Sequence, residues 1–135
     1  MAGFLTDYLN NKVMDCCFGG RPFESPPEVY VGLSLTRAYK GGYVAEPVAG
    51  GYARVAVPND LIHFPAASLG RKSNARAITF PTPSAGWGSV ISVFVADSAQ
   101  GGNILAMADL PLPRTVATGD LPPTIAVDTL RFSHA

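Results

Sequence analysis

Hydrophobic residues near the start of the chain recur every three or four positions, which is the period of a helix with one apolar face. A helix is therefore predicted to begin near Thr6 or Asp7. The glycines at positions 19 and 20 provide its stop, and Pro22 prevents its continuation. The apolar stripe of this helix contains Leu5, Tyr8, Leu9, Val13, Cys16 and Cys17. A helix this short is marginal in isolation and needs a surface to lie on.

From residue 28 onward, apolar and polar residues alternate in short runs, as in β-strands. The expected strands cover residues 29–35, 52–57, 61–64, 73–81, 87–97 and 104–110, followed by 114–118 and 124–132. The run 87–97 is apolar on both faces, with Ile91, Val93 and Val95 on one face and Val90 and Phe94 on the other. This pattern places it at the centre of a sheet, with 104–110 as its hairpin partner. Residues 37–51 are rich in glycine and are expected to form an exposed loop.

Short strands with turn signals between them predict an all-β fold. We expect a two-sheet β-sandwich, jelly-roll-like, with one short N-terminal amphipathic helix. The 135 residues fit a single domain, in which 1–20 form the N-terminal helix or arm and 28–135 form the sandwich. Pro122 and Pro123 interrupt the final segment, so the sequence leaves open whether 121–135 is a strand or an arm. The helix either closes an end of its own sandwich or docks on a partner.

Charged residues make up 15% of the chain and hydrophobic residues 47%, and ten basic residues balance ten acidic ones. This balance shows no electrostatic footprint for nucleic acid or for an anionic membrane, so we expect protein partners. A weakly charged, apolar exterior also suggests that part of the surface is covered by association. The sequence contains neither an 18-residue apolar run nor a secretory signal, from which we expect synthesis and retention in a cytoplasm.

The residues that carry chemistry form no pattern that predicts catalysis or metal binding. Cys16 and Cys17 are adjacent on the helix, where a mutual disulfide would be very strained, and are expected to be free thiols that act as small buried hydrophobes. His63 and His134 lie at no metal-ligand spacing from these cysteines. The carboxylates expected in solvated turns are Asp97, Asp109, Asp120 and Asp128. We therefore expect no enzyme activity, no catalytic, cofactor or metal site, and no small-molecule substrate.

Four aromatic residues are candidates for contacts with a ligand or with a partner. Trp87 lies between two glycines at the start of the most apolar strand. It is either an exposed platform for stacking on a sugar or the residue that closes one end of the core. Tyr39, Tyr43 and Tyr52 flank the 37–51 loop, and they are either ligand contacts or interface residues.

Six segments follow one another along the chain: LTDYLNNKVMDCCFGG, VYVGLSL, GGYARVAV, SNARAITFPTPSAGWGSV, VADSAQGGNILAMADL and PRTVATGD. They reach from about Leu5 to Asp120. Their order and spacing resemble a family of short tailed-phage virion proteins, which has a tail-fibre-like label and includes capsid cement or decoration proteins. No single segment is diagnostic, and the resemblance depends on the whole set.

The resemblance implies a β-sandwich on the capsid exterior of the virion, assembled in the host cytoplasm. Such a protein would bind the outer surface of the major capsid protein shell as a homodimer or homotrimer and would stabilise that shell. The alternative is a tail-fibre or virion surface domain that binds host carbohydrate. The residues expected at protein interfaces are Leu5, Tyr8, Leu9, Val13, Tyr39, Tyr43, Tyr52 and Trp87.

Overall fold

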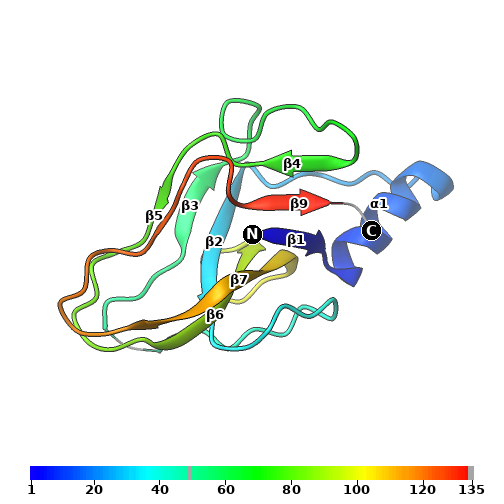
Figure 1. Cartoon of the computed structure of the whole chain (residues 1–135). Coiled ribbons are helices and arrows are strands. Elements are labelled where there is room, and N and C mark those ends of the chain that lie inside the picture. Colours follow the sequence, from blue (N-terminus) through cyan, green and yellow to red (C-terminus); the bar gives the residue numbers. More distant parts are fainter. Residues whose placement is uncertain (49, 134–135) are drawn as a thin grey trace.

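The computed structural model describes residues 1–48 and 50–133. These residues form a curled seven-stranded sheet, a small two-stranded sheet and one helix (Figure 1). The larger sheet has the strand order β3-β2-β6-β7-β1-β9-β4, and the smaller sheet pairs β5 with β8. The elements are β1 (Ala2–Leu5), α1 (Asp7–Gly19), β2 (Glu28–Ser34), β3 (Val55–Pro58), β4 (Arg71–Ser73), β5 (Ile78–Thr79), β6 (Gly88–Ala96), β7 (Ile104–Val116), β8 (Thr124–Ile125) and β9 (Arg131–Ser133). The predicted all-β, sandwich-like fold with one short N-terminal helix is confirmed.

Helix α1 begins and ends where the sequence predicts. Thr6 is the N-cap, and its hydroxyl also donates a hydrogen bond to the carbonyl of Ile104 on β7, so the cap is buried. Gly20 ends the helix in the left-handed conformation with φ 66°, and its N–H bonds to the carbonyl of Asp15. The helix lies against β7 and β1 at one end of the larger sheet (Figure 1).

Strand β1 is an element that the sequence pattern does not predict, because four residues with a glycine among them carry too little alternation. It lies between β7, to which it is antiparallel, and β9, to which it is parallel. The absence of a side chain at Gly3 lets β1 pack closely against β7. A Cβ added there would lie 2.7 Å from the carbonyl oxygen of Met107 and 2.8 Å from the Cβ of Ala108. The close approach of β1 to β7 therefore requires glycine.

Strand β6 lies between β2 and β7, as its apolar pattern predicts. The alternation of its faces is broken, however, by a register shift between Val90 and Ser92. Val90 consequently joins Val93 in the larger core, and Phe94 belongs to the smaller one, so the prediction that Val90 and Phe94 share a face is wrong. Opposite this shift, residues 110–113 of β7, with the sequence LPLP, bulge out of the ladder. Two prolines that cannot donate to a ladder account for the bulge.

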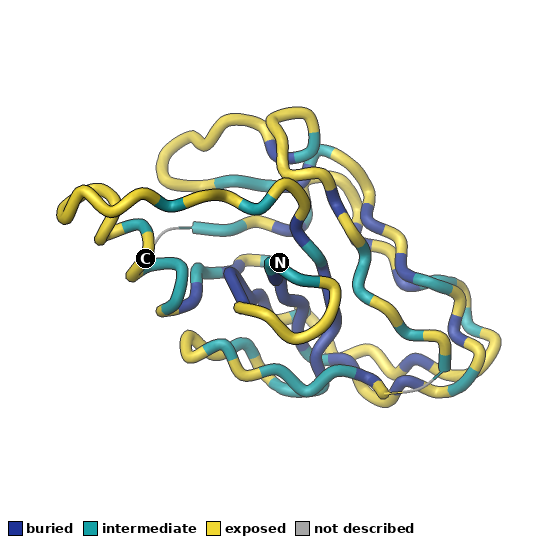
Figure 2. The backbone as a smooth tube through the Cα atoms, turned by 180° about the vertical axis from the view of Figure 1, so that it is seen from behind, coloured by how far each residue is buried: buried dark blue, intermediate teal, exposed yellow. Residues whose placement is uncertain are grey.

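Two apolar cores lie on opposite faces of the central strands. The larger one is covered by the two-stranded sheet through Ile78 and Ile125. The smaller one surrounds Phe94 and is covered by the loop after β2 through Ala38 and Val44. Figure 2 shows buried residues concentrated along the central strands, whereas the helix and the long loops are mostly exposed. The sandwich is therefore asymmetric, with one large sheet and one minimal sheet.

The strand predicted at residues 61–64 is wrong, since these residues form a turn. The carboxylate of Asp60 accepts hydrogen bonds from the backbone N–H groups of Ile62 at 3.0 Å and His63 at 2.9 Å. An aspartate that bonds the backbone two and three residues later stabilises a turn in preference to an extended ladder.

The remaining strand predictions differ from the structure in extent. The strand expected at 73–81 is divided into β4 and β5, because the side chain of Asn74 bonds the carbonyl of Arg76 and turns the chain. The strand expected at 52–57 begins only at Val55, whereas the two expected at 104–110 and 114–118 are joined in β7. Residues 124–125 and 131–133 are strands, which answers the question left open for the end of the chain as far as residue 133.

Candidate functional site

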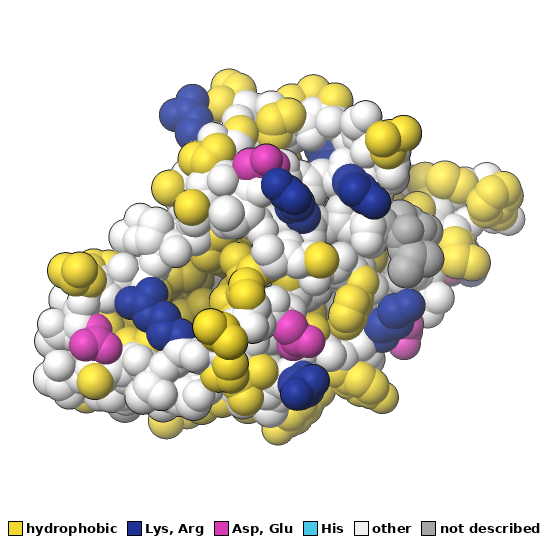
Figure 3. Space-filling model, in the orientation of Figure 1, with side chains coloured by type: hydrophobic (Ala, Val, Ile, Leu, Met, Phe, Trp, Pro, Cys, Tyr) yellow, Lys and Arg dark blue, Asp and Glu magenta, His cyan; other side chains and the backbone are white. Residues whose placement is uncertain are grey.

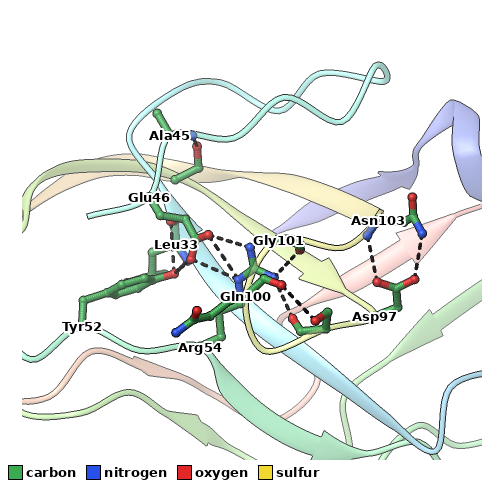
Figure 4. Close-up of polar contacts among 11 residues, drawn as sticks. Leu33, Ala45, Glu46, Tyr52, Arg54, Asp97, Gln100, Gly101 and Asn103 are labelled. Carbon is green, nitrogen blue, oxygen red and sulfur yellow. Dashed lines mark hydrogen bonds and ion pairs between the residues drawn. The ribbon is translucent and has the colours of Figure 1, made fainter. Parts of the chain in front are cut away.

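The loop that follows β2 is attached to the sheet by a cluster of polar contacts around Arg54, which we call the Arg54 clamp (Figure 4). The side chain of Arg54 is only 4% exposed. Its Nη2 lies 2.6 Å from Oε1 of Glu46, and its Nε donates to both carboxylate oxygens of Glu46 at 3.1 and 3.2 Å. Its Nη1 donates to the carbonyls of Ser98 at 2.7 Å and Gly101 at 2.9 Å. The guanidinium therefore joins the loop to the β6–β7 turn.

Tyr52 is the second member of the Arg54 clamp. Its hydroxyl accepts a hydrogen bond from the backbone N–H of Leu33 at 2.9 Å and donates one to Oε2 of Glu46 at 2.7 Å (Figure 4). Burial and, as the second largest cause, the hydrogen bond to Glu46 raise the pKa of the Tyr52 hydroxyl far above its usual range. The guanidinium of Arg54 also lies 5.0 Å from the ring centre of Phe94, in cation–π geometry. Tyr52 therefore stays protonated and serves as a structural bridge.

The β6–β7 turn that receives Arg54 is itself fixed by side-chain bonds. Oδ1 of Asp97 accepts from the backbone N–H of Asn103 at 2.8 Å, and Oδ2 accepts from the Asn103 side-chain amide at 3.1 Å (Figure 4). At the other end of the loop, the carbonyl of Lys40 accepts a hydrogen bond from the N–H of Asp7 in the first turn of α1 at 2.8 Å. The loop is thus held at both ends, on the helix and on the clamp.

The loop presents apolar side chains to the outside beside these two anchors: Tyr39 precedes Lys40, Tyr43 lies between the anchors, and Val48 follows Glu46. Tyr39 and Tyr43 are 63% and 64% exposed, and Val48 is 99% exposed. Exposed tyrosines on a loop that is rigidly held resemble the contact residues of protein interfaces, since little conformational entropy remains to be lost on binding. This loop surface, defined by Tyr39 and Tyr43, is the candidate functional site of the molecule, whereas Val48 lies further along the chain beside the clamp residues Glu46 and Arg54. Tyr52, predicted together with these tyrosines, is instead half-buried in the clamp.

Trp87 closes the core, and the interpretation of this residue as an exposed sugar platform is wrong. Its side chain is 3% exposed, and its indole Nε1 donates to the carbonyl of Gly50 at 2.9 Å. Its ring packs edge-to-face against Tyr52, with ring centres 5.3 Å apart. Gly50 has φ +75°, and a Cβ there would lie 2.8 Å from the indole ring, so the indole and the glycine fix each other.

The apolar stripe of α1 is divided between two environments. Leu5 lies in β1, so its predicted place on the helix is wrong, but like Tyr8 and Leu9 of α1 it is partly buried against the larger core. Val13 is half-buried. None of the described residues of α1 is fully buried. The first half of the helix therefore packs on its own sheet in the way a lid does. Within residues 1–48 and 50–133, no helix has the length and apolar character needed to cross a bilayer.

The second half of α1 projects past the sheet. Cys16 and Cys17 are both exposed free thiols, so the prediction that they are buried is wrong. The reason is that β7 and β1 support only the first turns of the helix, and Met14 and Phe18 are exposed as well, at 52% and 91%. Helical periodicity predicts which residues share a face, but it does not predict how far the supporting sheet extends.

The predicted solvated carboxylates accept backbone hydrogen bonds: Asp109, which lies within β7 and not in a turn, holds the loop after β2, and Asp120 stabilises a turn. Asp109 accepts from the N–H of Ala38 at 2.7 Å, and Asp120 accepts from the N–H of Ala117 at 2.8 Å. His63 forms a 2.8 Å contact with Asp60. In the part of the chain that the structure describes, no three His, Cys, Asp or Glu side chains gather as metal ligands. His134 lies outside the described residues, and the absence of enzyme activity stays a prediction.

Comparison with known families decides what kind of protein carries this loop. The model of the Gp80 family, described as podophage GP4 fiber I protein gp80, matches residues 4–133. The chain belongs to the Gp80 family. Among curated proteins, none matches it. Membership of the Gp80 family makes the chain a structural protein of a bacteriophage virion with a fibre-type label. The predicted virion family and virion location are thereby confirmed at this level.

The sequence did not indicate the Arg54 clamp of this Gp80 family member. Glu46 and Arg54 are eight positions apart on either side of a glycine-rich turn, with no periodicity that joins them. The only signal in the sequence is indirect. Charged residues are 15% of the chain, so a Glu and an Arg at the two ends of the same apolar loop are candidates for an ion pair.

Proposed function

We propose that this protein is a structural subunit of a fibre-type appendage on the outside of a phage virion, and that it acts through protein contacts without catalysis. The match to the Gp80 family over residues 4–133 is the observation that carries this proposal. The loop surface of Tyr39 and Tyr43 supports it, because exposed aromatic side chains on a loop that is fixed in advance favour binding to another protein.

The position of the protein in the virion is the first test. Antibodies against the purified chain, coupled to gold particles, should label appendages of intact virions and leave the rest of the head surface unlabelled. The protein should be present at a small fraction of the copy number of the coat protein, as measured by gel densitometry. A uniform label over the head, with a copy number comparable to that of the coat protein, would contradict the proposal and favour the cement role on the major capsid protein shell.

The loop surface is the second test. The variant Tyr39→Ser/Tyr43→Ser removes the two exposed aromatic side chains of the loop surface and leaves every clamp residue unchanged. Leu112→Ser/Leu121→Ser is the matched control, because these leucines are 79% and 82% exposed elsewhere on the surface. Supplied in trans to a phage that lacks the gene, the loop variant should be folded by circular dichroism but missing from purified virions, and the control should be incorporated. Equal incorporation of both variants would remove the loop from the proposal.

A further inference from the structure

The edge of the larger sheet formed by β4 and β9 carries a concentration of positive charge that the proposed function does not use. Two adjoining hollows, of about 280 and 250 Å³, share Arg71 and Arg131 in their walls. Lys72 and Asp128 line the first hollow. We call the two hollows together the β4–β9 groove. Figure 3 shows basic side chains gathered over β4 and β9, with an acidic side chain beside them.

The register of the two strands brings the basic groups to one face. Ser73 pairs with Arg131, and Arg71 pairs with Ser133. Residues directly opposite each other, and residues two apart on one strand, point to the same side of a sheet. Two guanidinium groups and two hydroxyl groups therefore share one face of the β4–β9 ribbon. Ser68, at the turn before β4, adds a third hydroxyl to the lining of the first hollow.

Arg131 is held by hydrogen bonds to a turn, and that turn is itself bonded to the buried Asn74. Its Nε donates to the carbonyl of Asp128 at 3.0 Å, and its Nη2 lies 3.3 Å from Oδ2 of Asp128. Asp128 has φ 62°, and its N–H donates to the carbonyl of Asn74 at 2.8 Å. Asn74 is 2% exposed, and its side chain bonds the carbonyl of Ala126 and the N–H of Leu130. The groove wall is therefore a preorganised part of the fold.

The charge of the groove differs from that of the molecule as a whole. The chain has ten basic and ten acidic residues, whereas the guanidinium groups of Arg71 and Arg131 face the single carboxylate of Asp128 in the groove. Lys72, which pairs with Phe132, points to the other face of the ribbon, where its ammonium group donates to the carbonyl of Phe64 at 3.0 Å. A local excess of positive charge in a hollow attracts anions and concentrates them there.

We propose that the β4–β9 groove binds an anionic polysaccharide, with the carboxylate or phosphate of one sugar unit between Arg71 and Arg131 and neighbouring units in the two hollows. The planar fork of arginine matches both oxyanions. The serine hydroxyls on both sides suit the hydroxyls of a sugar chain. The positive charge is confined to one short ribbon, which disfavours nucleic acid as the ligand. The proposal rests on the proposed external position of the protein, where polymers of the host surface are within reach.

The test uses the purified full-length chain and defined polymers. Affinity electrophoresis in gels that contain polygalacturonate, dextran or poly-glutamate measures binding to a carboxylated sugar chain, a neutral sugar chain and a carboxylated peptide. We expect retardation by polygalacturonate, none by dextran and at least about tenfold weaker binding to poly-glutamate. Equal binding to poly-glutamate and polygalacturonate would overturn the assignment to a glycan. Absence of retardation by polygalacturonate would overturn the site itself.

Two double variants distinguish binding by the groove arginines from a general effect of positive charge. Arg71→Gln/Arg131→Gln should weaken binding to polygalacturonate about tenfold or more, because two charge-assisted contacts are lost. Arg21→Gln/Arg37→Gln removes the same charge from exposed sites elsewhere and should change the affinity less than about twofold. Equal losses in both would overturn the proposal. Arg71→Gln alone leaves the Asp128–Arg131 turn intact and tests the groove if the double variant is unstable.

The outcomes also distinguish this inference from the proposed function. Gold label on appendages together with no binding to polygalacturonate refutes the groove and leaves the structural role in place. Binding in the gel by a protein that labels the whole head refutes the appendage role and leaves a glycan site on the capsid surface.

Discussion

Replacing Glu46 with alanine should destabilise this protein far more than a loop substitution usually does. The change removes the acceptor for Nε and Nη2 of Arg54, whose side chain is 4% exposed, and for the hydroxyl of Tyr52. A buried guanidinium would then keep only the carbonyls of Ser98 and Gly101. A buried charge that loses its counter-ion is among the most costly defects in a folded protein.

The size of this effect follows from how exposed the pair is. Removing one partner of a fully buried ion pair costs about 3–5 kcal/mol. The Glu46 side chain is 25% exposed, so water can reach the vacated position and recover part of the loss. We therefore expect Glu46→Ala to lower the free energy of unfolding by about 2 kcal/mol. In a domain of this size that corresponds to a fall in Tm of about 6–10 °C.

Thermal and urea unfolding followed by circular dichroism measure this change. Glu24→Ala, at an exposed position outside the clamp, is the control and should stay within about 0.5 kcal/mol of the wild type. The double variant Glu46→Ala/Arg54→Met should be at least as stable as Glu46→Ala, because an apolar side chain over the ring of Phe94 replaces an unpaired charge. A Tm of Glu46→Ala equal to that of the control, or a double variant that loses stability additively, would refute the reasoning.

Three further predictions concern single side chains. Folding raises the pKa of Tyr52 above its usual 10.0, so the folded state keeps a proton that the unfolded state loses. The stability contributed by Tyr52 should therefore be complete below about pH 10 and decline as the pH rises. In urea unfolding from about pH 9 to 11, Tyr52→Phe should show a flatter decline than the wild type, and identical slopes would count against this account. Leu69 has a left-handed φ of 52° and is 94% exposed. Asparagine tolerates this backbone conformation better than leucine, so Leu69→Asn should raise the free energy of unfolding, measured in urea, by about 0.5–1 kcal/mol. A lower free energy of unfolding would show that Leu69 is not strained. A Cβ at Gly32 would collide with the ring of Phe94 and lie 2.8 Å from the hydroxyl of Tyr52, so Gly32→Ala should cost about 1–3 kcal/mol, and an unchanged Tm would disprove the tight packing.

The elements that the sequence predicts well are those with local signals. The start and end of α1 are correct because Thr6 and Gly20 act on their immediate neighbours. The central position of β6 is correct because only a strand covered on both faces can be apolar on both. The strand at residues 61–64 is wrong because the side chain of Asp60 determines a turn that hydropathy does not register.

The candidate site depends on contacts between distant parts of the chain, and the sequence predicts only part of it. Tyr39 and Tyr43 are correctly placed on an exposed loop. The contact between Arg54 and the carbonyls of Ser98 and Gly101 joins positions more than forty residues apart, and a single sequence holds no signal for it. The same limit explains the cysteines, since their exposure depends on where the sheet beneath the helix ends.

The position of β1 has a consequence for the order in which the molecule is built. Ala2 pairs with Arg131 and Phe4 with Ser133, so β1 has as its neighbour a strand that comes much later in the sequence. Until β9 has been synthesised, β1 has an unpaired edge and β4 has no link to the rest of the larger sheet. The nascent chain therefore cannot close this sheet before β9 has emerged, and the closure joins strands over a long sequence separation, of the kind that makes folding slow.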